Sequence, residues 1–314
     1  MGENYGDEKS LKLDKNELKE HKFSKKALKE FGALYSVVRL LISPKSAKIG
    51  WGYIRSVFLN FFFLQFKQRV GIYKIPVIHV DHPLDRKIPF VPSKVGVYMD
   101  FVGLYLRPNT MYLKRFGIKN AVPFCNEWFS LLSKVYAEAG SLYRRILSTT
   151  ERPQYKENRM FRLIHFWDPH LLCVPSIHIA VVVLAVAVFK KQFKKLGFSD
   201  AEYFQKNTEL YNEAVEIAES VLLIKQHSVN CVAAALYMVT KLFPEYFTPN
   251  DAVNFINDMF LASDAVSFES SAEIKEYISF MYERFLLEGY STEDWKEPVI
   301  NWLSTYEIDM ETKK

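Results

Sequence analysis

CVPSIHI (Cys173–Ile179) and IKQHSVNC (Ile224–Cys231) are two short segments that lie about fifty residues apart in this 314-residue chain. Each segment places a histidine, His178 or His227, beside small or cationic residues within an otherwise apolar run. An imidazole in such surroundings can attack an electrophilic centre or transfer a proton. The two segments therefore indicate a reaction site built from parts that are distant in the sequence.

A third segment upstream supplies cations. Arg145 is followed seven positions later by Arg152–Pro153, and Ser176 stands two residues before His178. Cations and a hydroxyl can hold an oxyanion while one imidazole attacks phosphorus and the other protonates the leaving oxygen. The order of these residues therefore favours phosphate chemistry.

These segments resemble the type 2 phosphatidic acid phosphatase and vanadium haloperoxidase superfamily, whose motifs read KxxxxxxRP, PSGH and SRxxxxxHxxxD. Order and internal spacing match in all three, as Arg145-x6-Arg152-Pro153, Pro175-Ser176-Ile177-His178 and Ser220-Val221-x5-His227-x3-Cys231. LDRKIPFVP (Leu84–Pro92) and the Lys225-Gln226-His227 run resemble the branch that includes inositol phosphorylceramide synthases. The resemblance covers roughly Gly50 to Pro244.

The resemblance implies a role for each residue. His227 would be the nucleophile that forms a phosphohistidine, and His178 would be the general acid. Ser176, Arg145 and Arg152 would bind the non-bridging oxygens. The mechanism needs no metal or cofactor; vanadate would mimic its transition state, and a haloperoxidase would hold vanadate as a cofactor. The expected activity is that of a phosphatase or phosphotransferase acting on a phospholipid or another phosphomonoester.

Two positions depart from the family pattern. Val221 replaces the arginine of the SR pair, and Cys231 replaces the aspartate that orients the nucleophilic imidazole. Lys225 could supply the missing positive charge, or it could simply lie at a helix end, and Glu219 could supply the missing carboxylate. Loss of such an orienting carboxylate lowers rates by orders of magnitude. The alternative is therefore a catalytically degenerate member that acts as a membrane, scaffold or phosphate-binding protein.

Two readings without phosphate chemistry are also open. His178 and His227 could be hydrogen-bonded core histidines. Alternatively, the pairs His170-x2-Cys173 and His227-x3-Cys231 could close a tetrahedral zinc site. The ordered pattern with the two arginines favours the phosphate site over both.

Composition sets the fold class. Hydrophobic residues make up 49% of the chain and aromatic residues 15%, which is ample for a large core. Three widely spaced cysteines do not form a disulfide framework. Helical periodicity indicates helices along much of the chain. With the resemblance, it implies an all-α bundle with three parts: a charged helical arm (1–49), a phosphatidic acid phosphatase-like domain (50–247) and an acidic helical C-terminal module (248–314). A second Arg-Pro pair, Arg107–Pro108, is read as a helix end.

The net charge of +5 is unevenly distributed. From Asn250 onward there are fourteen acidic and five basic residues, a balance of −9, so residues 1–249 carry +14. A basic body suits phosphate-bearing ligands or anionic lipid, whereas no motif indicates nucleic-acid binding. The acidic C-terminal segment is a possible site for a protein partner.

Membrane attachment is the last expectation. Leu171–Phe189 contains no fixed charge over 19 residues and ends at Lys190, Lys191, Lys194 and Lys195. It is long enough to span a bilayer, or it could be a buried core helix of a soluble bundle. The positive-inside rule and the charged N-terminus, which lacks a secretory signal, predict an integral or tightly associated membrane protein with both termini cytoplasmic. Mean hydropathy is only −0.07.

Overall fold

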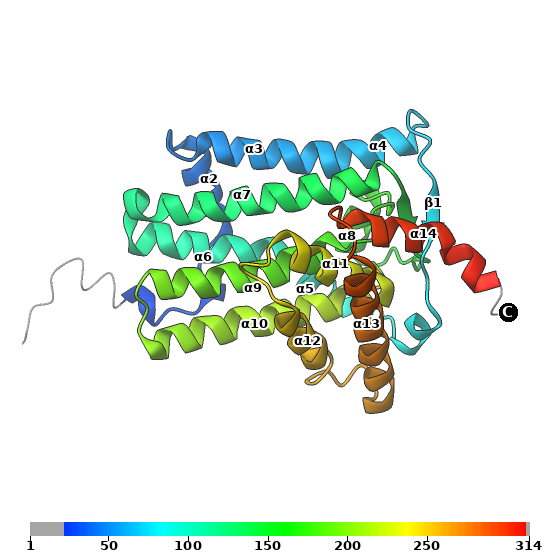
Figure 1. The fold of residues 1–314 in the computed structure, drawn as a ribbon. Coiled ribbons are helices and arrows are strands. Elements are labelled where there is room, and N and C mark those ends of the chain that lie inside the picture. The colour runs from blue at the N-terminus through cyan, green and yellow to red at the C-terminus, as the bar shows by residue number, and fades with distance from the viewer. Residues whose placement is uncertain (1–21, 312–314) are drawn as a thin grey trace, which may run out of the picture.

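The computed structural model describes residues 22–311, and this part of the chain is mostly helical. Figure 1 shows its long helices lying side by side, with C-terminal helices that cross one end of the bundle. The predicted all-α class is confirmed. Among the described residues, no helix combines the length and the apolar character needed to cross a lipid bilayer.

The first described segment is docked on the bundle. Of the helical arm predicted over residues 1–49, residues 1–21 lie outside the described residues. After residue 21, Leu28 of the 3-10 turn η1 (Leu28–Glu30) and Phe31, which follows it, are buried. The amide of Leu28 donates to Glu209 Oε2 at 2.8 Å. This part of the arm is therefore packed against the helix that carries Glu209.

Helix α2 (Ala33–Ile42) leads into a long rod at one edge of the bundle (Figure 1). The rod consists of α3 (Ala47–Val57), the π-helical segment η2 (Phe58–Phe62) and α4 (Phe63–Arg69). It lies along α7 (Gly117–Tyr143). The wider π turn changes which side chains face inward, a device often found at functional sites.

The prolines and β-branched residues of the stretch 72–92 predict an extended loop. It contains β1 (Val77–His79) and the 3-10 turns η3 (Pro83–Lys87) and η4 (Pro92–Lys94). Strand β1 pairs in parallel with β2 (Leu147–Thr149), with Val77 opposite Leu147. This pairing joins the 72–92 stretch to the segment that contains Arg145 and Arg152.

Helices α5 (Val95–Met99), α6 (Phe101–Arg115) and α8 (Arg159–Trp167) complete the first half of the bundle. The expectation of a helix end at Arg107–Pro108 is wrong, because α6 continues through both residues. Arg107 forms ion pairs with Asp100 and with Glu213 of α10. A partly buried guanidinium held by two carboxylates thus links α6 to α10 and to the junction between α5 and α6.

Helix α9 (Ile177–Lys195) lies in the centre of the bundle. Every residue from Ile177 to Phe189 is buried, and the helix packs on α6, α7, α10 and α11. Of the two interpretations of the apolar stretch 171–189, the structure shows the buried core helix. The apolar surface of α9 is covered by other helices of the same chain.

Helices α10 (Asp200–Leu223) and α11 (Val229–Leu242) flank α9. The helical spacing of the apolar residues in 202–224 predicts an amphipathic helix. Its apolar face is buried, since Leu210, Ala214, Ile217, Val221 and Ile224 are all fully buried. Because α9 and α11 both begin at the same end of the bundle, their first turns bring the two histidine segments together.

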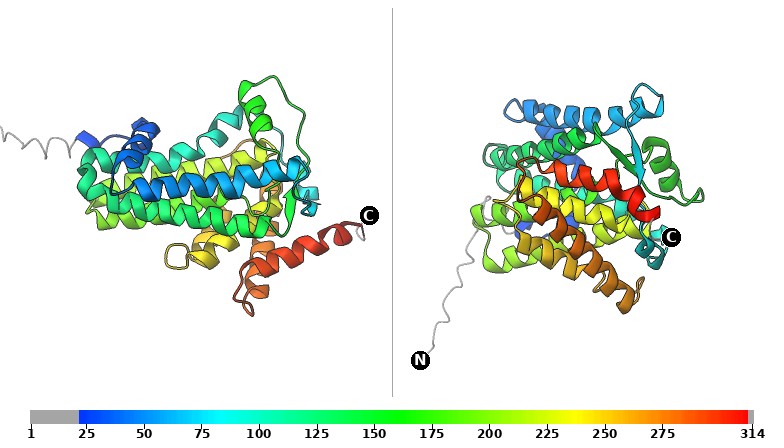
Figure 2. Two further views of the ribbon diagram at one scale, coloured as in Figure 1. Left: turned by 90° about the horizontal axis from the view of Figure 1, so that it is seen from above. Right: turned by 45° about the vertical axis from the view of Figure 1, so that its right-hand side comes forward.

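The acidic C-terminal module consists of α12 (Pro249–Asp258), α13 (Phe268–Glu288) and α14 (Lys296–Glu311). The side chain of Thr248 caps α12 by accepting the amide of Asp251. Helix α13 packs across α11, as the right-hand view of Figure 2 shows. The module therefore covers the far side of the helix that follows His227.

Candidate active site

The two predicted histidines face each other. His178 lies in the first turn of α9, and His227 lies just before the N-cap of α11. Their ring centroids are 5.6 Å apart, and the rings are inclined at 63°. Two motifs separated in sequence thus meet at one place.

His178 is enclosed by aromatic rings. Tyr98 and Phe101 place their rings 4.5 Å and 4.4 Å from its own, and only 9% of the residue is exposed. Burial lowers the pKa of His178 well below its ordinary value, because desolvation disfavours the cationic ring. His178 is therefore neutral in the ligand-free protein at neutral pH.

The turn after α10 positions His227. Lys225 has a φ of +56° and occupies the left-handed position that ends many helices. The amides of Gln226 and His227 both return to the carbonyl of Val221, at 3.0 Å and 3.2 Å. Val221, which stands where the family has an arginine, thus closes this turn through its backbone.

Nδ1 of His227 lies 3.2 Å from the carbonyl oxygen of Cys173. A carbonyl oxygen can only accept a hydrogen bond, so Nδ1 carries the proton and Nε2 keeps its lone pair. Burial lowers the pKa of His227 to about 4. The ring is therefore neutral, oriented and in the tautomer that a nucleophilic Nε2 requires.

Cys231 does not orient His227. Its Sγ lies 3.4 Å from the amide of Ser228, at the N-terminus of α11. Glu219, considered as a substitute carboxylate, accepts the amide of Phe260 instead. The backbone carbonyl of Cys173 makes the contact that we expected from a carboxylate.

Ser176 serves as the N-cap of α9. Its Oγ accepts the amide of Ile179 at 3.4 Å, and its own amide donates to the carbonyl of Cys231 at 3.3 Å. The second bond ties the start of α9 to the first turn of α11. Ser176 thus fixes the position of one histidine segment relative to the other, and it lies two residues from His178.

Arg152 contacts the residues next to the histidine pair rather than the two rings themselves. Its Nη1 donates to Gln226 Oε1 at 3.2 Å, and its Nη2 donates to the backbone oxygen of Asp168 at 3.3 Å. Gln226 directly precedes His227 in the turn. Of the two predicted arginines, Arg152 is therefore the one whose contacts join it to the segment that contains His227.

The side chains of Arg145 and Lys225 make their contacts away from the two histidine rings. The side chain of Arg145 is 55% exposed and forms an ion pair of 3.6 Å with Asp294, just before α14. The Lys225 ammonium donates to the carbonyls of Asp85 and Ile88, within the LDRKIPFVP segment. Lys225 anchors this segment to the turn before His227, so it has the helix-end role that we considered as an alternative.

Two residues of the site were not predicted for phosphate chemistry: Asp168 was not named at all, and His170 was named only as a zinc ligand. Asp168 and His170 line a small cavity together with Cys173, His178 and His227, and its volume of about 10 Å³ holds about one water. Burial raises the pKa of Asp168, and its carboxylate accepts the amide of His170 at 2.9 Å. The sequence signal was the Trp-Asp-Pro-His run, which places a carboxylate two residues from a histidine.

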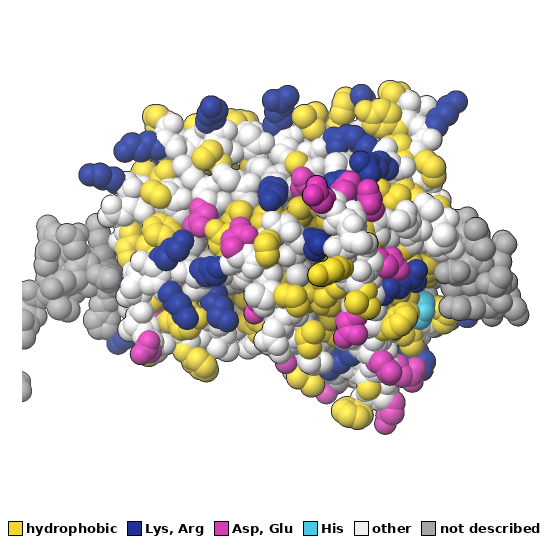
Figure 3. Space-filling model, viewed as in Figure 1, with side chains coloured by type: hydrophobic (Ala, Val, Ile, Leu, Met, Phe, Trp, Pro, Cys, Tyr) yellow, Lys and Arg dark blue, Asp and Glu magenta, His cyan; other side chains and the backbone are white. Residues whose placement is uncertain are grey.

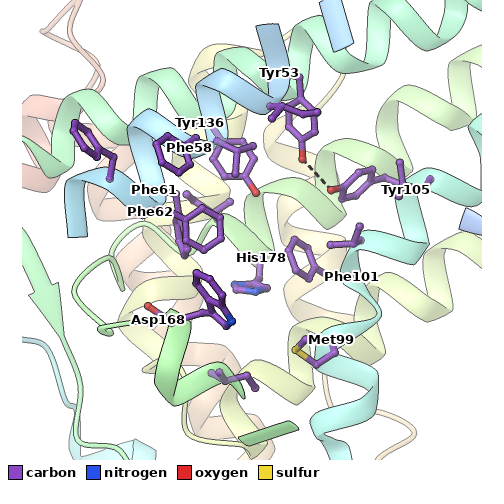
Figure 4. A pocket seen from close by; sticks show the side chains of 18 of the residues that line it. Tyr53, Phe58, Phe61, Phe62, Met99, Phe101, Tyr105, Tyr136, Asp168 and His178 are labelled. Carbon is purple, nitrogen blue, oxygen red and sulfur yellow. Dashed lines mark hydrogen bonds between the residues drawn. The ribbon is translucent and has the colours of Figure 1, made fainter. Parts of the chain in front are cut away.

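A large apolar groove reaches this site. Its volume is about 1250 Å³, above the roughly 300–1,000 Å³ of typical small-molecule pockets. Aromatic and aliphatic side chains line most of it, and Asp168 and His178 are among its few polar lining residues (Figure 4). Tyr53 and Tyr105, which also line it, share a hydrogen bond of 3.0 Å. The groove can hold a hydrocarbon chain with its head beside the histidines.

A second, polar cleft of about 690 Å³ lies beneath the C-terminal module. Arg152 and Lys225 line it together with Arg86 and Arg284, and Asp81, Asp85 and Glu151 balance these cations. His227 is not among its lining residues. Arg152 and Lys225 therefore also line a space that is large enough for an anion and lies away from the histidine pair.

The zinc alternative does not assemble. In the part of the chain from 22 to 311, no group of three or more His, Cys, Asp or Glu side chains is placed to hold a metal ion. The three cysteines are free and buried.

A comparison of the chain with protein-family models, curated proteins and solved structures found no significant match.

Proposed function

We propose that the protein is a divergent bundle of the phosphatidic acid phosphatase type that transfers phosphoryl groups from an amphiphilic phosphate ester. The observation that carries the proposal is the pair formed by His178 and His227, with Nδ1 of His227 directed to the Cys173 carbonyl. This arrangement leaves Nε2 of His227 as a neutral nucleophile.

The chemistry would proceed in two steps. Nε2 of His227 attacks phosphorus, and the bond from phosphorus to the ester oxygen breaks. The negative charge of a bound phosphate raises the pKa of His178, which takes up a proton when the substrate binds and donates it to that oxygen. Water or an alcohol then attacks phosphorus and gives its proton to His178, the phosphorus–nitrogen bond breaks, and His227 is regenerated. Arg152 would offset the charge on the non-bridging oxygens.

The substrate class follows from the groove. Its apolar lining and the presence of His178 in that lining support a substrate with at least one hydrocarbon chain and a phosphate head. The hydrocarbon chain of such a substrate would lie in the groove, and its phosphate would lie next to the small cavity between the histidines. The proposed class is therefore a phospholipid or a lipid phosphate.

The experiment compares wild type with His227→Asn on a long-chain phosphatidic acid in detergent micelles. Asparagine can still donate to the Cys173 carbonyl, so the variant removes only the nucleophile. His79→Asn, at an exposed position in β1, is the control. We expect the His227 variant to lose about 1000-fold or more in turnover. Turnover that persists in this variant would exclude the phosphohistidine mechanism.

A non-catalytic lipid-binding protein is the second candidate, and the position of Arg145 favours it. One of the expected phosphate ligands lies at the surface in an ion pair with Asp294. Vanadate binding separates the two candidates, because it needs no turnover. Binding that requires His227 supports the enzyme, whereas lipid binding without vanadate binding supports the non-catalytic protein. Vanadate binding that requires Arg152 but not His227 would place the anion in the polar cleft.

A further inference from the structure

The exposed hydrophobic side chains are concentrated in one part of the chain. Half of the large hydrophobic side chains exposed within residues 22–306 lie between Leu34 and Ile72. Trp51, Phe58 and Phe66 of the rod are each more than half exposed. Apolar surface gathered in this way marks an interaction site rather than ordinary scatter.

Along the rod these side chains form a single stripe. Trp51, Ile54, Phe58, Phe62 and Phe66 are spaced three or four residues apart and are all exposed, so they follow one side of the helix. The opposite side packs on α7. A helix that is apolar toward the protein core and also toward solvent needs a second apolar neighbour.

The stripe borders the mouth of the groove. Ile54, Phe58, Phe62 and Phe66 all line the groove as well as being exposed. On the other side of the mouth, α8 contributes Leu163, Phe166 and Trp167, which are 48%, 70% and 59% exposed. Helix α8 stands apart from the rod at its α4 end (Figure 2, left). The mouth of the groove is thus rimmed by exposed apolar side chains from two elements.

The charge of this region has one sign. Between Phe31 and Val80 there is no Asp or Glu, but there are seven cations: Arg39, Lys45, Lys48, Arg55, Lys67, Arg69 and Lys74. Six of the seven are exposed, all but Lys67. In Figure 3, Lys and Arg side chains alternate with hydrophobic ones along the upper edge, where the rod lies. The chain as a whole is far less biased, with 41 basic and 36 acidic residues.

We propose that the rod α3–α4 and helix α8 rest on an anionic lipid leaflet, with the mouth of the groove opening into it. Aromatic side chains sit well at the boundary of headgroups and acyl chains, and lysines and arginines bind anionic headgroups. A protein partner would also cover apolar surface, but an uninterrupted set of cations fits a uniformly anionic sheet. The surface is distinct from the histidine pair, so the proposal stands without the chemistry.

The test uses the full chain with vesicles of phosphatidylcholine alone and vesicles that also contain phosphatidylserine. We expect flotation with the anionic vesicles and release by high salt, because exposed charges are screened. The variant Trp51→Glu/Phe58→Glu/Phe66→Glu should bind at least about tenfold more weakly. Phe204→Glu/Phe268→Glu/Leu287→Glu, exposed elsewhere, adds the same charge and should bind like wild type. His227→Asn should also bind like wild type, which separates this test from that of the enzyme.

Tryptophan fluorescence gives a second measurement that needs no disruptive variant. Trp51 and Trp167 lie on the proposed surface and are more than half exposed, whereas Trp128, Trp295 and Trp302 are buried. Brominated acyl chains in the anionic vesicles should quench the first two, and Trp51→Phe/Trp167→Phe should lose the quenching. Wild type that does not float with anionic vesicles, equal loss in the control triple variant, or quenching that persists in the double variant would each overturn the proposal.

Discussion

The Cys173 carbonyl oxygen lies 3.2 Å from Nδ1 of His227 and holds that imidazole in one tautomer. In the resembled family an aspartate would make this contact, so here a neutral backbone group takes the place of a charged side chain. A carbonyl orients the ring but offsets less of the positive charge that develops on it. We therefore expect a competent but slow nucleophile.

Cys231→Asp tests whether the carboxylate can be restored. Residue 231 lies in the buried first turn of α11, and Nδ1 of His227 already has its acceptor. We expect no gain in turnover and a loss of stability of about 2 kcal/mol or more, because the new carboxylate is buried without a cation. Chemical denaturation and phosphate release measure the two effects, with Cys231→Ser as the isosteric control. A large increase in turnover would mean that the aspartate is the missing catalytic group.

The two histidines should make the fold sensitive to acid. Burial lowers the pKa of His227 from 6.5 to about 4 and also lowers that of His178. Between these pH values the unfolded chain binds more protons than the folded chain, so stability falls as the pH decreases from 6.5 toward 4. For His227 alone the full effect is about 3 kcal/mol at 1.4 kcal/mol per pH unit. Urea unfolding at several pH values measures the slope, and His227→Asn should reduce it.

Lys225 is expected to matter for stability rather than for anion binding. Its ammonium donates to the carbonyls of Asp85 and Ile88, and its charge lies near the buried carboxylate of Asp85. Lys225→Met should lower the free energy of unfolding by about 1–3 kcal/mol, the usual range for lost hydrogen bonds to a charged group. Vanadate affinity at the histidine pair should stay within about twofold, since no hydrogen bond joins Lys225 to that pair. A selective loss of vanadate binding without a loss of stability would contradict this assignment.

Arg152 and Arg145 give opposite expectations. Arg152 contacts Gln226, next to His227, whereas Arg145 is paired with Asp294 at the surface. Arg152→Ala should weaken vanadate binding by about tenfold or more, because charge-assisted bonds to an anion contribute about 1.5–3 kcal/mol. Arg145→Ala should leave it unchanged and cost less than about 1 kcal/mol of stability. Titration monitored by thermal shift distinguishes them, and equal losses would show that Arg145 leaves Asp294 to bind the anion.

Patterns of spacing predicted the parts of this fold that depend on local periodicity. The buried stripe of α10 and the meeting of His178 with His227 followed from residue types at fixed intervals. The environment of Arg145 could not be predicted, because its partner Asp294 is distant in the sequence and only tertiary packing brings them together. The contact from the Cys173 carbonyl was equally hidden, since every residue carries a carbonyl and sequence does not show where it points.

The proposed substrate class makes a prediction about the groove. Val102 lines it, and Val102→Trp should fill part of its volume of about 1250 Å³. KM for a long-chain lipid phosphate should then rise about tenfold, while turnover of a short water-soluble phosphate ester should change little, because only the long chain needs the groove. Val253→Trp, at an exposed position on α12, controls for the added indole. An equal effect on both substrates would show that the groove does not take the hydrocarbon chain and would leave the histidine pair acting on a soluble ester.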